Sequence, residues 1–230
     1  MNPSSTSHSG SQQGPELPLL QQLFNKVISN ILRSVRQEEP LITKYDTIAG
    51  DGDCGTTLLK GVSSLALYSS QLTSDTADLG IVFRQMASLV ETNMGGTSGA
   101  IYAIFMNAVS TGLLEKSRRT DARAPYPTLL TDALQHGLGE LYSYMSARVG
   151  QRTMMDALIP FVETFATTGD LSAGVVAAAD GAEATRQMEA VLGRTSYISK
   201  GWLDREKGGV PDPGAVGVVR ILRGLRAGLS

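Results

Sequence analysis

The sequence has few of the features that would place it outside the ordinary globular class. It contains one cysteine, Cys54, so no disulfide can form within the chain, and a reducing, cytoplasmic location is expected. No apolar run approaches the ~20 residues that cross a bilayer, so membrane insertion is not expected. The formal net charge of −2 lacks a basic excess, which argues against nucleic acid as a partner. With 230 residues, 42% of them hydrophobic, the chain is long enough for one well-buried core.

Period-two alternation, the signal of half-buried strands, is also missing. Apolar residues recur instead at helical spacing, so the pattern predicts an all-α chain of about eight helices. The first apolar stripe runs from Leu20 to Val35, and Pro40 is expected to end its helix, because proline disfavours helix in the preceding residue. The later helices are expected over about 56–68, 79–93, 97–110, 128–147, 154–165, 171–192 and 213–227. A charged loop is expected at 115–127.

The first sixteen residues have a different composition from the rest. They are rich in Ser, Gln and Gly and lack apolar periodicity and the hydrophobic segment of a secretory signal. The sequence therefore predicts a disordered tail or interdomain linker over 1–16 and a single folded domain over 17–230.

Three aspartates stand close together in the stretch from Tyr45 to Thr57. Asp46, Asp51 and Asp53 fall within eight residues, among glycines and threonines. Three neighbouring carboxylates repel one another unless a cation sits among them, and Mg²⁺ prefers oxygen ligands together with substrate phosphates. The pattern predicts a metal–phosphate site, although an Asp-Gly-Asp sequence alone is often only a solvated turn.

Three glycine-bearing helix starts could hold phosphates beside that cation. They are Cys54-Gly55-Thr56-Thr57, Gly95-Gly96-Thr97-Ser98-Gly99 and Asp212-Pro213-Gly214. A helix N-terminus presents unpaired N–H groups and a partial positive charge, and glycine lets the backbone approach an anion. Each stretch alone is more often a connecting loop or a plain helix cap, so the prediction of a Mg-nucleotide site rests on their joint occurrence.

Competing metal and phosphate motifs are absent from the sequence. An EF-hand loop that began at Asp51 would need an acidic residue at its twelfth position, where Val62 stands. No Gly-Lys-Ser/Thr sequence occurs, which excludes a Walker loop.

Taken together and in this order, the motifs resemble the nucleotide-binding, L-type domain of dihydroxyacetone kinases. The resemblance spans about residues 17–229 and includes Asp46-x4-Asp51-x-Asp53, Gly-Gly-Thr-Ser-Gly, Arg194-Thr-Ser-Tyr197 and Asp212-Pro-Gly-Ala215. The form Gly-Asp-Gly-Asp-Cys-Gly looks closest to the single-chain, ATP-dependent enzymes, in which a linker joins this domain to a substrate-binding domain.

The resemblance implies an antiparallel eight-helix barrel with ATP or ADP and two Mg²⁺ ions at one end. It implies that Asp46, Asp51 and Asp53 are the metal ligands and act in catalysis. The implied nucleotide-binding residues are Cys54, Gly55, Thr56, Thr57, Gly96, Thr97, Ser98, Met154, Arg194, Asp212, Pro213 and Gly214. Two departures stand out: Met145 replaces a glycine that some relatives use, and the loop between Arg194 and Asp212 is about five residues longer than in bacterial subunits.

The implied activity is transfer of the γ-phosphate to a hydroxyl of dihydroxyacetone or a related short sugar. In the family, a histidine of another domain holds that substrate, and this chain contains no such domain. A dihydroxyacetone-binding domain is therefore the expected partner, in the same chain or a separate one, and any dimer is expected to form through it. The alternatives are a phosphocarrier or regulatory module without turnover, and a fatty-acid kinase-like role.

Overall fold

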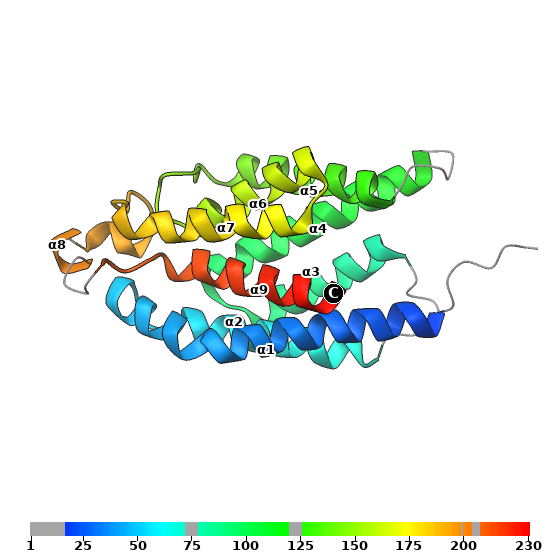
Figure 1. The fold of residues 1–230 in the computed structure, drawn as a ribbon, viewed down its shortest axis with the longest axis horizontal. Helices are drawn as coiled ribbons and strands as arrows, with labels where there is room; N and C mark the ends of the chain where they lie inside the picture. Colours follow the sequence, from blue (N-terminus) through cyan, green and yellow to red (C-terminus); the bar gives the residue numbers. More distant parts are fainter. Residues whose placement is uncertain (1–16, 72–77, 120–125, 199, 204–207) are drawn as a thin grey trace, which may run out of the picture.

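The computed structural model describes residues 17–71, 78–119, 126–198, 200–203 and 208–230 (Figure 1). The predicted tail over 1–16 lies outside these ranges. The described residues contain helices and no strand, which confirms the predicted all-α class. The elements are α1 (Leu17–Ala49), α2 (Cys54–Ser69), α3 (Leu79–Asn93), α4 (Gly96–Arg119), α5 (Tyr126–Tyr144), α6 (Met155–Thr168), α7 (Leu171–Ala184), the 3-10 turns η2 (Thr185–Gln187) and η3 (Arg194–Tyr197), α8 (Lys200–Leu203) and α9 (Pro213–Leu229).

The eight longer helices of the described chain form a closed ring. From α1 to α7 each helix packs against the next one, α7 packs against α9, and α9 packs against α1. Neighbouring helices joined by short connections run antiparallel. The last and first helices lie side by side along the length of the molecule (Figure 1), so the chain folds into the antiparallel helical barrel that was expected.

The first helix does not end at Pro40. It continues through the proline to Ala49, so the predicted boundary is wrong. Proline lacks the N–H that would bond to the carbonyl four residues earlier, which costs ~3 kcal/mol in a helix interior. Burial of the residues beyond the proline offsets that cost, because Ile42 is fully buried and Asp46 is 7% exposed. Tertiary packing of this last third against α2 outweighs the local signal.

Other boundaries also differ from the sequence-based expectation. Helix α4 runs nine residues past Ser110 to Arg119, into the segment that was expected to be a charged loop. Helix α7 ends at Ala184 rather than near Leu192. Part of the expected loop after Ile198 forms the short helix α8.

The core lies inside the barrel and consists mainly of aliphatic side chains, with Val35, Val109, Leu141 and Val162 fully buried. Helix α4 corrects the expectation about apolar runs, since Gly96–Glu115 is long and apolar enough to span a membrane by length and composition alone. In the fold it packs between α3 and α5, as a core helix does.

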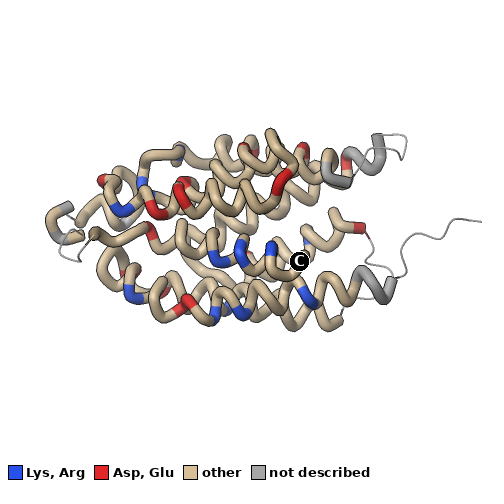
Figure 2. The backbone as a smooth tube through the Cα atoms, in the orientation of Figure 1, with Lys and Arg blue, Asp and Glu red and all other residues tan. Residues whose placement is uncertain are grey.

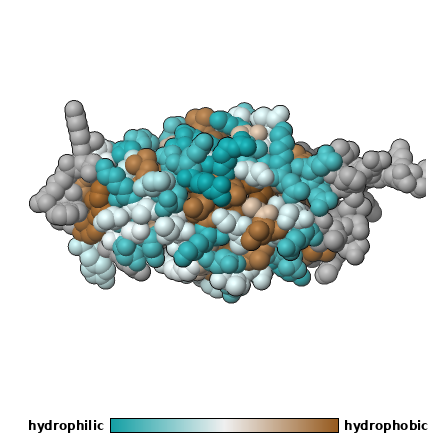
Figure 3. Space-filling view, turned by 90° about the horizontal axis from the view of Figure 1, so that it is seen from below, coloured by the Kyte–Doolittle hydropathy of each residue, from teal (hydrophilic) through white to brown (hydrophobic). Residues whose placement is uncertain are grey.

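Charged side chains are distributed unevenly along the barrel. Figure 2 shows basic positions along α1 and α9, and acidic ones toward the end where α1 stops and α9 starts. Seen from below, the surface is mostly hydrophilic with hydrophobic residues interspersed (Figure 3). The end at which α1 stops and α9 starts is where the predicted site residues gather.

Candidate functional site

The loop from Asp46 to Asp53 folds back on the end of α1. The main-chain N–H of Gly50 donates to the carbonyl of Asp46 at 2.6 Å, and the N–H of Cys54 donates to Oδ2 of Asp46 at 2.9 Å. Gly52 adopts a φ of +80°, which L side chains rarely adopt. A side chain at Gly50 would collide with the Asp46 carboxylate. The two glycines are therefore needed to let this loop close.

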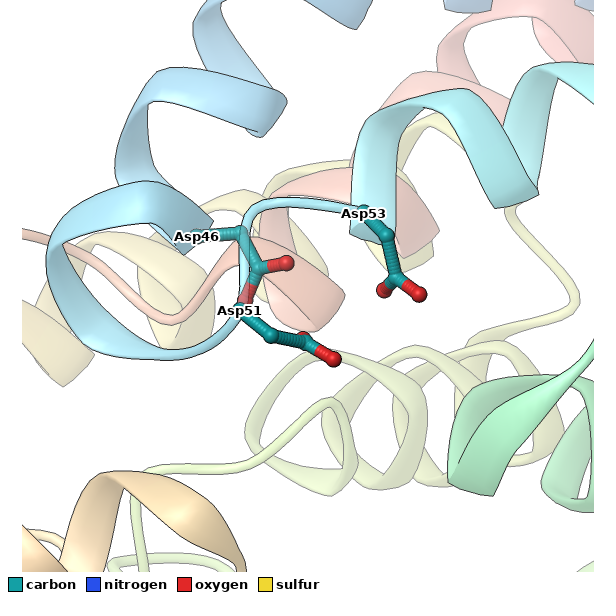
Figure 4. A group of neighbouring side chains, drawn as sticks. All are labelled: Asp46, Asp51 and Asp53. Carbon is teal, nitrogen blue, oxygen red and sulfur yellow. The ribbon is translucent and has the colours of Figure 1, made fainter.

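The loop brings the three predicted carboxylates together. One oxygen from each of Asp46, Asp51 and Asp53 lies within 4.8 Å of the other two, and the side chains point to the same side of the loop (Figure 4). Asp46 is buried at the end of α1, whereas Asp51 and Asp53 are exposed. Three converging carboxylate oxygens at an open surface fit a hard divalent cation that keeps waters or phosphate oxygens as further ligands.

Helix α2 begins directly at this cluster. The main-chain N–H of Thr57 and the hydroxyl of Thr56 both donate to the carbonyl of Asp53, each at 2.9 Å. Gly55 is buried against Glu39 and Thr43 of α1, where a side chain would not fit. Burial and the surrounding aspartates raise the pKa of the Cys54 thiol to about 12. Cys54 is thus a neutral thiol rather than a thiolate.

Helix α9 begins beside the same cluster, with Asp212 as its N-cap. Its Oδ1 accepts a hydrogen bond from the N–H of Ala215 at 2.8 Å, and its own N–H donates to Oγ1 of Thr185 at 2.8 Å. Burial raises the pKa of Asp212 to about 6; the Ala215 N–H and the charge of Arg152 lower it, whereas Asp156 and Asp46 raise it. Gly214 lies against both Asp212 and Met154, so Met154 lies beside the predicted stretch that begins α9.

Helix α4 presents the third glycine-bearing start. Gly96 has a φ of +72° with open space around it, Thr97 is exposed and Ser98 is half-buried. One turn along α4, the buried Tyr102 hydroxyl faces Gly217 of α9. The pKa of Tyr102 is raised by burial and by the nearby Cys54 and Asp212. Tyr102 therefore connects the beginnings of α2, α4 and α9 at one end of the barrel.

Arg194 opens η3, but its side chain lies outside the described residues. The turn itself is tied to the site, because Oγ1 of Thr195 donates to the carbonyl of Ala49 at 2.7 Å. Met145, which replaces a glycine of some relatives, is half-buried just after α5.

Sequence reasoning missed three residues of this region: Tyr102, Arg152 and Thr185. Tyr102 could have been noticed as the one aromatic residue within a turn of the Gly-Gly-Thr-Ser-Gly stretch. Arg152 and Thr185 carry no local signal, because their partners Val210 and Asp212 are 58 and 27 residues away in sequence.

Comparisons with known proteins show what this chain is similar to. The DAK2 domain family model matches residues 48–227. A dihydroxyacetone kinase of Komagataella pastoris is 40% identical over 205 residues, and dihydroxyacetone kinase 2 of Saccharomyces cerevisiae is 42% identical over 206 residues. Each alignment covers 88% of this chain and 34% of the relative. The human triokinase/FMN cyclase is 31% identical over 207 residues, which cover 86% of this chain and 34% of that protein. The chain thus spans about a third of the length of these relatives.

The fold also matches a solved structure. The dihydroxyacetone kinase of C. freundii in complex with AMP-PNP and Mg²⁺ superposes with a TM-score of 0.66 at 23% sequence identity. The match covers 98% of this chain and 37% of that one. At this identity, the likeness establishes the shared helical fold.

Proposed function

This chain is a member of the DAK2 domain family, and we propose that it is the nucleotide-binding half of an ATP-dependent dihydroxyacetone kinase. It binds ATP with Mg²⁺ and donates the γ-phosphoryl group to a hydroxyl of dihydroxyacetone or a related short ketose or triose. The observation that carries the proposal is the convergence of three carboxylates, within 4.8 Å of one another, beside the start of α2.

The three aspartates would hold the metal. Asp46 is fixed by its hydrogen bond from Cys54, while the exposed Asp51 and Asp53 can adjust to the ligand. Magnesium, when bound, neutralises phosphate charge, which is the main chemical demand of phosphoryl transfer. We propose two ions, which is the number that the resemblance to the L-type domain of dihydroxyacetone kinases implies.

The helix starts would hold the nucleotide. The N–H groups at the beginnings of α2, α4 and α9 and the hydroxyls of Thr57, Thr97 and Ser98 are suited to phosphate oxygens. The hydroxyl of Thr56 donates to the carbonyl of Asp53 and would turn from it to bind a phosphate. Met154 lies buried next to Gly214 and would contact the bound nucleotide. Arg194 is proposed as a further contact because Thr195 fixes its turn to the end of α1.

The acceptor would come from a partner. The relatives named dihydroxyacetone kinase are about three times as long as the stretch that this chain matches. We propose that a dihydroxyacetone-binding domain, in the same chain or a separate one, presents the hydroxyl to this end of the barrel and forms any dimer contact. We propose a cytoplasmic location, because the sequence has one cysteine and so carries no disulfide within it.

Turnover with and without a partner tests the proposal. The chain is mixed with ATP, Mg²⁺ and dihydroxyacetone, alone and together with the substrate-binding domain of a yeast relative, and ADP release is followed. Release only with the partner domain is expected. ADP binding without turnover under any pairing would instead favour a carrier or regulatory module, and a lack of ADP binding would contradict the nucleotide site itself.

A further inference from the structure

Arg152 is buried in an unusual way. Its side chain is 1% exposed, which makes it the largest of the fully buried side chains among the described residues. Its Nη2 donates to the carbonyl of Val210 at 2.7 Å, while Nε and Nη1 have no hydrogen-bond partner in the described structure. A buried cation costs several kcal/mol unless an opposite charge compensates for it. The burial of Arg152 is therefore costly unless a neighbouring negative charge offsets it.

The backbone of Arg152 is strained as well. Its φ of +58° is the one positive φ found at a non-glycine residue in the described chain. The left-handed region costs a residue with a Cβ about 1–2 kcal/mol, and such strain persists where the surroundings hold it in place. The conformation at Arg152 sends its side chain inward to Val210, whereas the neighbouring Arg148 stacks over the ring of Tyr142 at 3.9 Å.

The compensating charge comes from the nucleotide end of the barrel. Burial lowers the pKa of the Arg152 guanidinium, and the charge of Asp212 opposes this by favouring the protonated form. The same pair acts in the other direction, since Arg152 favours the ionised carboxylate of Asp212. Arg152 therefore touches the turn before α9 at Val210, and its charge interacts with the carboxylate of Asp212, which caps α9.

We propose that Arg152 is a positioning residue of the nucleotide site. Through the Val210–Asp212 turn, Arg152 holds the start of α9 against the start of α6. It also supplies the positive charge that interacts with the Asp212 carboxylate. Its side chain is too buried to be an exposed ligand contact. Its effect on the nucleotide is transmitted by Gly214, at the start of α9, and by Met154, directly before α6, because these two residues lie against each other. The inference rests on the proposed function.

Several other groups face Asp212 and contribute to its charge state. They are Asp156 at the start of α6, Asp46 at the end of α1, Cys54 at the start of α2 and Tyr102 of α4. Cys54 and Tyr102 stay neutral near pH 7, because the pKa of each is raised. Arg152 is the cation of this set, so its removal shifts the titration of Asp212 to higher pH.

The test compares Arg152→Met and Arg152→Lys with the wild type by calorimetric titration with ADP and Mg²⁺ between pH 5.5 and 8.5. Arg152→Met should weaken ADP binding ~10-fold or more at pH 7 and move the midpoint of the pH profile upward. Arg152→Lys, which keeps the charge, should recover most of the affinity. The protonation of ADP itself changes with pH in the same way for the wild type and both variants. Only the differences between their affinity–pH profiles are therefore interpreted.

Arg148→Met is the matched control on the same loop and should bind ADP like the wild type. Thermal unfolding of each variant confirms that binding is measured on folded protein. If the wild type does not bind ADP, the proposed function fails. If it binds and Arg152→Met has the same affinity and pH profile, the positioning role is wrong. Equal losses in the Lys and Met variants with unshifted profiles would reduce Arg152 to a structural residue and would also overturn the proposal.

Discussion

The N–H of Cys54 donates a hydrogen bond of 2.9 Å to the Asp46 carboxylate, and this bond joins the last turn of α1 to the first turn of α2. One buried side chain thereby closes the loop that carries the other two aspartates. Asp46 has a structural role in the chain without metal and a proposed ligand role with it, and the two roles can be separated by substitution.

Asp46→Asn should keep the loop closed, because an amide oxygen still accepts the Cys54 bond, but should lose the Mg²⁺-induced rise in melting temperature. Asp46→Ala should lose that rise and also destabilise the metal-free protein by about 1–2 kcal/mol, since it leaves the Cys54 N–H unpaired. Scanning calorimetry with and without Mg²⁺ distinguishes the two. Equal stabilities of the metal-free variants would mean that the bond contributes nothing to loop closure.

The start of α4 offers a matched pair of glycines. Gly95 and Gly96 both have open space where a side chain would go, but only Gly96 has a positive φ, of +72°. Gly96→Ala should therefore cost about 1–2 kcal/mol and weaken nucleotide binding several-fold, because the loop must change its shape. Gly95→Ala should change stability and nucleotide affinity much less. Chemical denaturation and nucleotide titration of the pair provide the measurement, and the same result for both variants would refute a requirement for left-handed backbone.

Asp212 should make stability depend on pH. Its pKa is raised from 3.8 to about 6 in the folded chain, so the folded state binds the proton more tightly. This contribution to stability is fully present below pH 3.8 and is lost as pH rises through about 6.

Asp212→Asn mimics the protonated carboxyl and can still cap α9. In the absence of nucleotide and metal, the variant should exceed the wild type in melting temperature by several degrees at pH 8, since each pKa unit corresponds to about 1.4 kcal/mol. The difference should shrink toward pH 4. A gap that does not change with pH would show that this carboxyl is not the titrating group.

Pro40 should be a site where stability can be gained. Its ring is exposed, and alanine would restore the N–H that α1 lacks at that point. Pro40→Ala is expected to stabilise the chain by about 1–3 kcal/mol and to leave nucleotide affinity unchanged. Gln37→Ala, one turn earlier and also exposed, controls for helix propensity. A melting temperature at or below that of the wild type would indicate that the native helix accommodates the proline without strain.

The features that were correctly predicted are those with a local cause. Asp212 followed by proline predicted the start of α9, and the structure has the expected cap bond to Ala215. The helix expected over about 154–165 begins where Asp156 accepts a hydrogen bond from the Thr153 N–H at 2.7 Å, a pairing that capping-box spacing favours. The three aspartates are close in sequence, so a sharp turn suffices to bring them together.

The features that were missed depend on distant packing. Whether α1 passes through Pro40 depends on the burial of Ile42 and Asp46 against other helices, which the residues around the proline do not reveal. The apolar pattern over 79–93 would place Leu79 in the core, but Leu79 is 37% exposed. The adjacent Gly80 is buried instead, and its carbonyl accepts a hydrogen bond from the Ser110 hydroxyl at 2.6 Å. The inward orientation of Arg152 depends on Val210, far along the chain.

The aspartate cluster is proposed to bind the metal through which the nucleotide is held. Calorimetric titration of ADP into the wild type and Asp51→Ala, each with Mg²⁺ and with a chelator, tests it most directly; Glu163→Ala, an exposed acid on α6, is the control. Mg²⁺ should strengthen ADP binding to the wild type and to the control, and should have no effect on ADP binding to Asp51→Ala. Wild-type, Mg²⁺-dependent affinity in Asp51→Ala would contradict it.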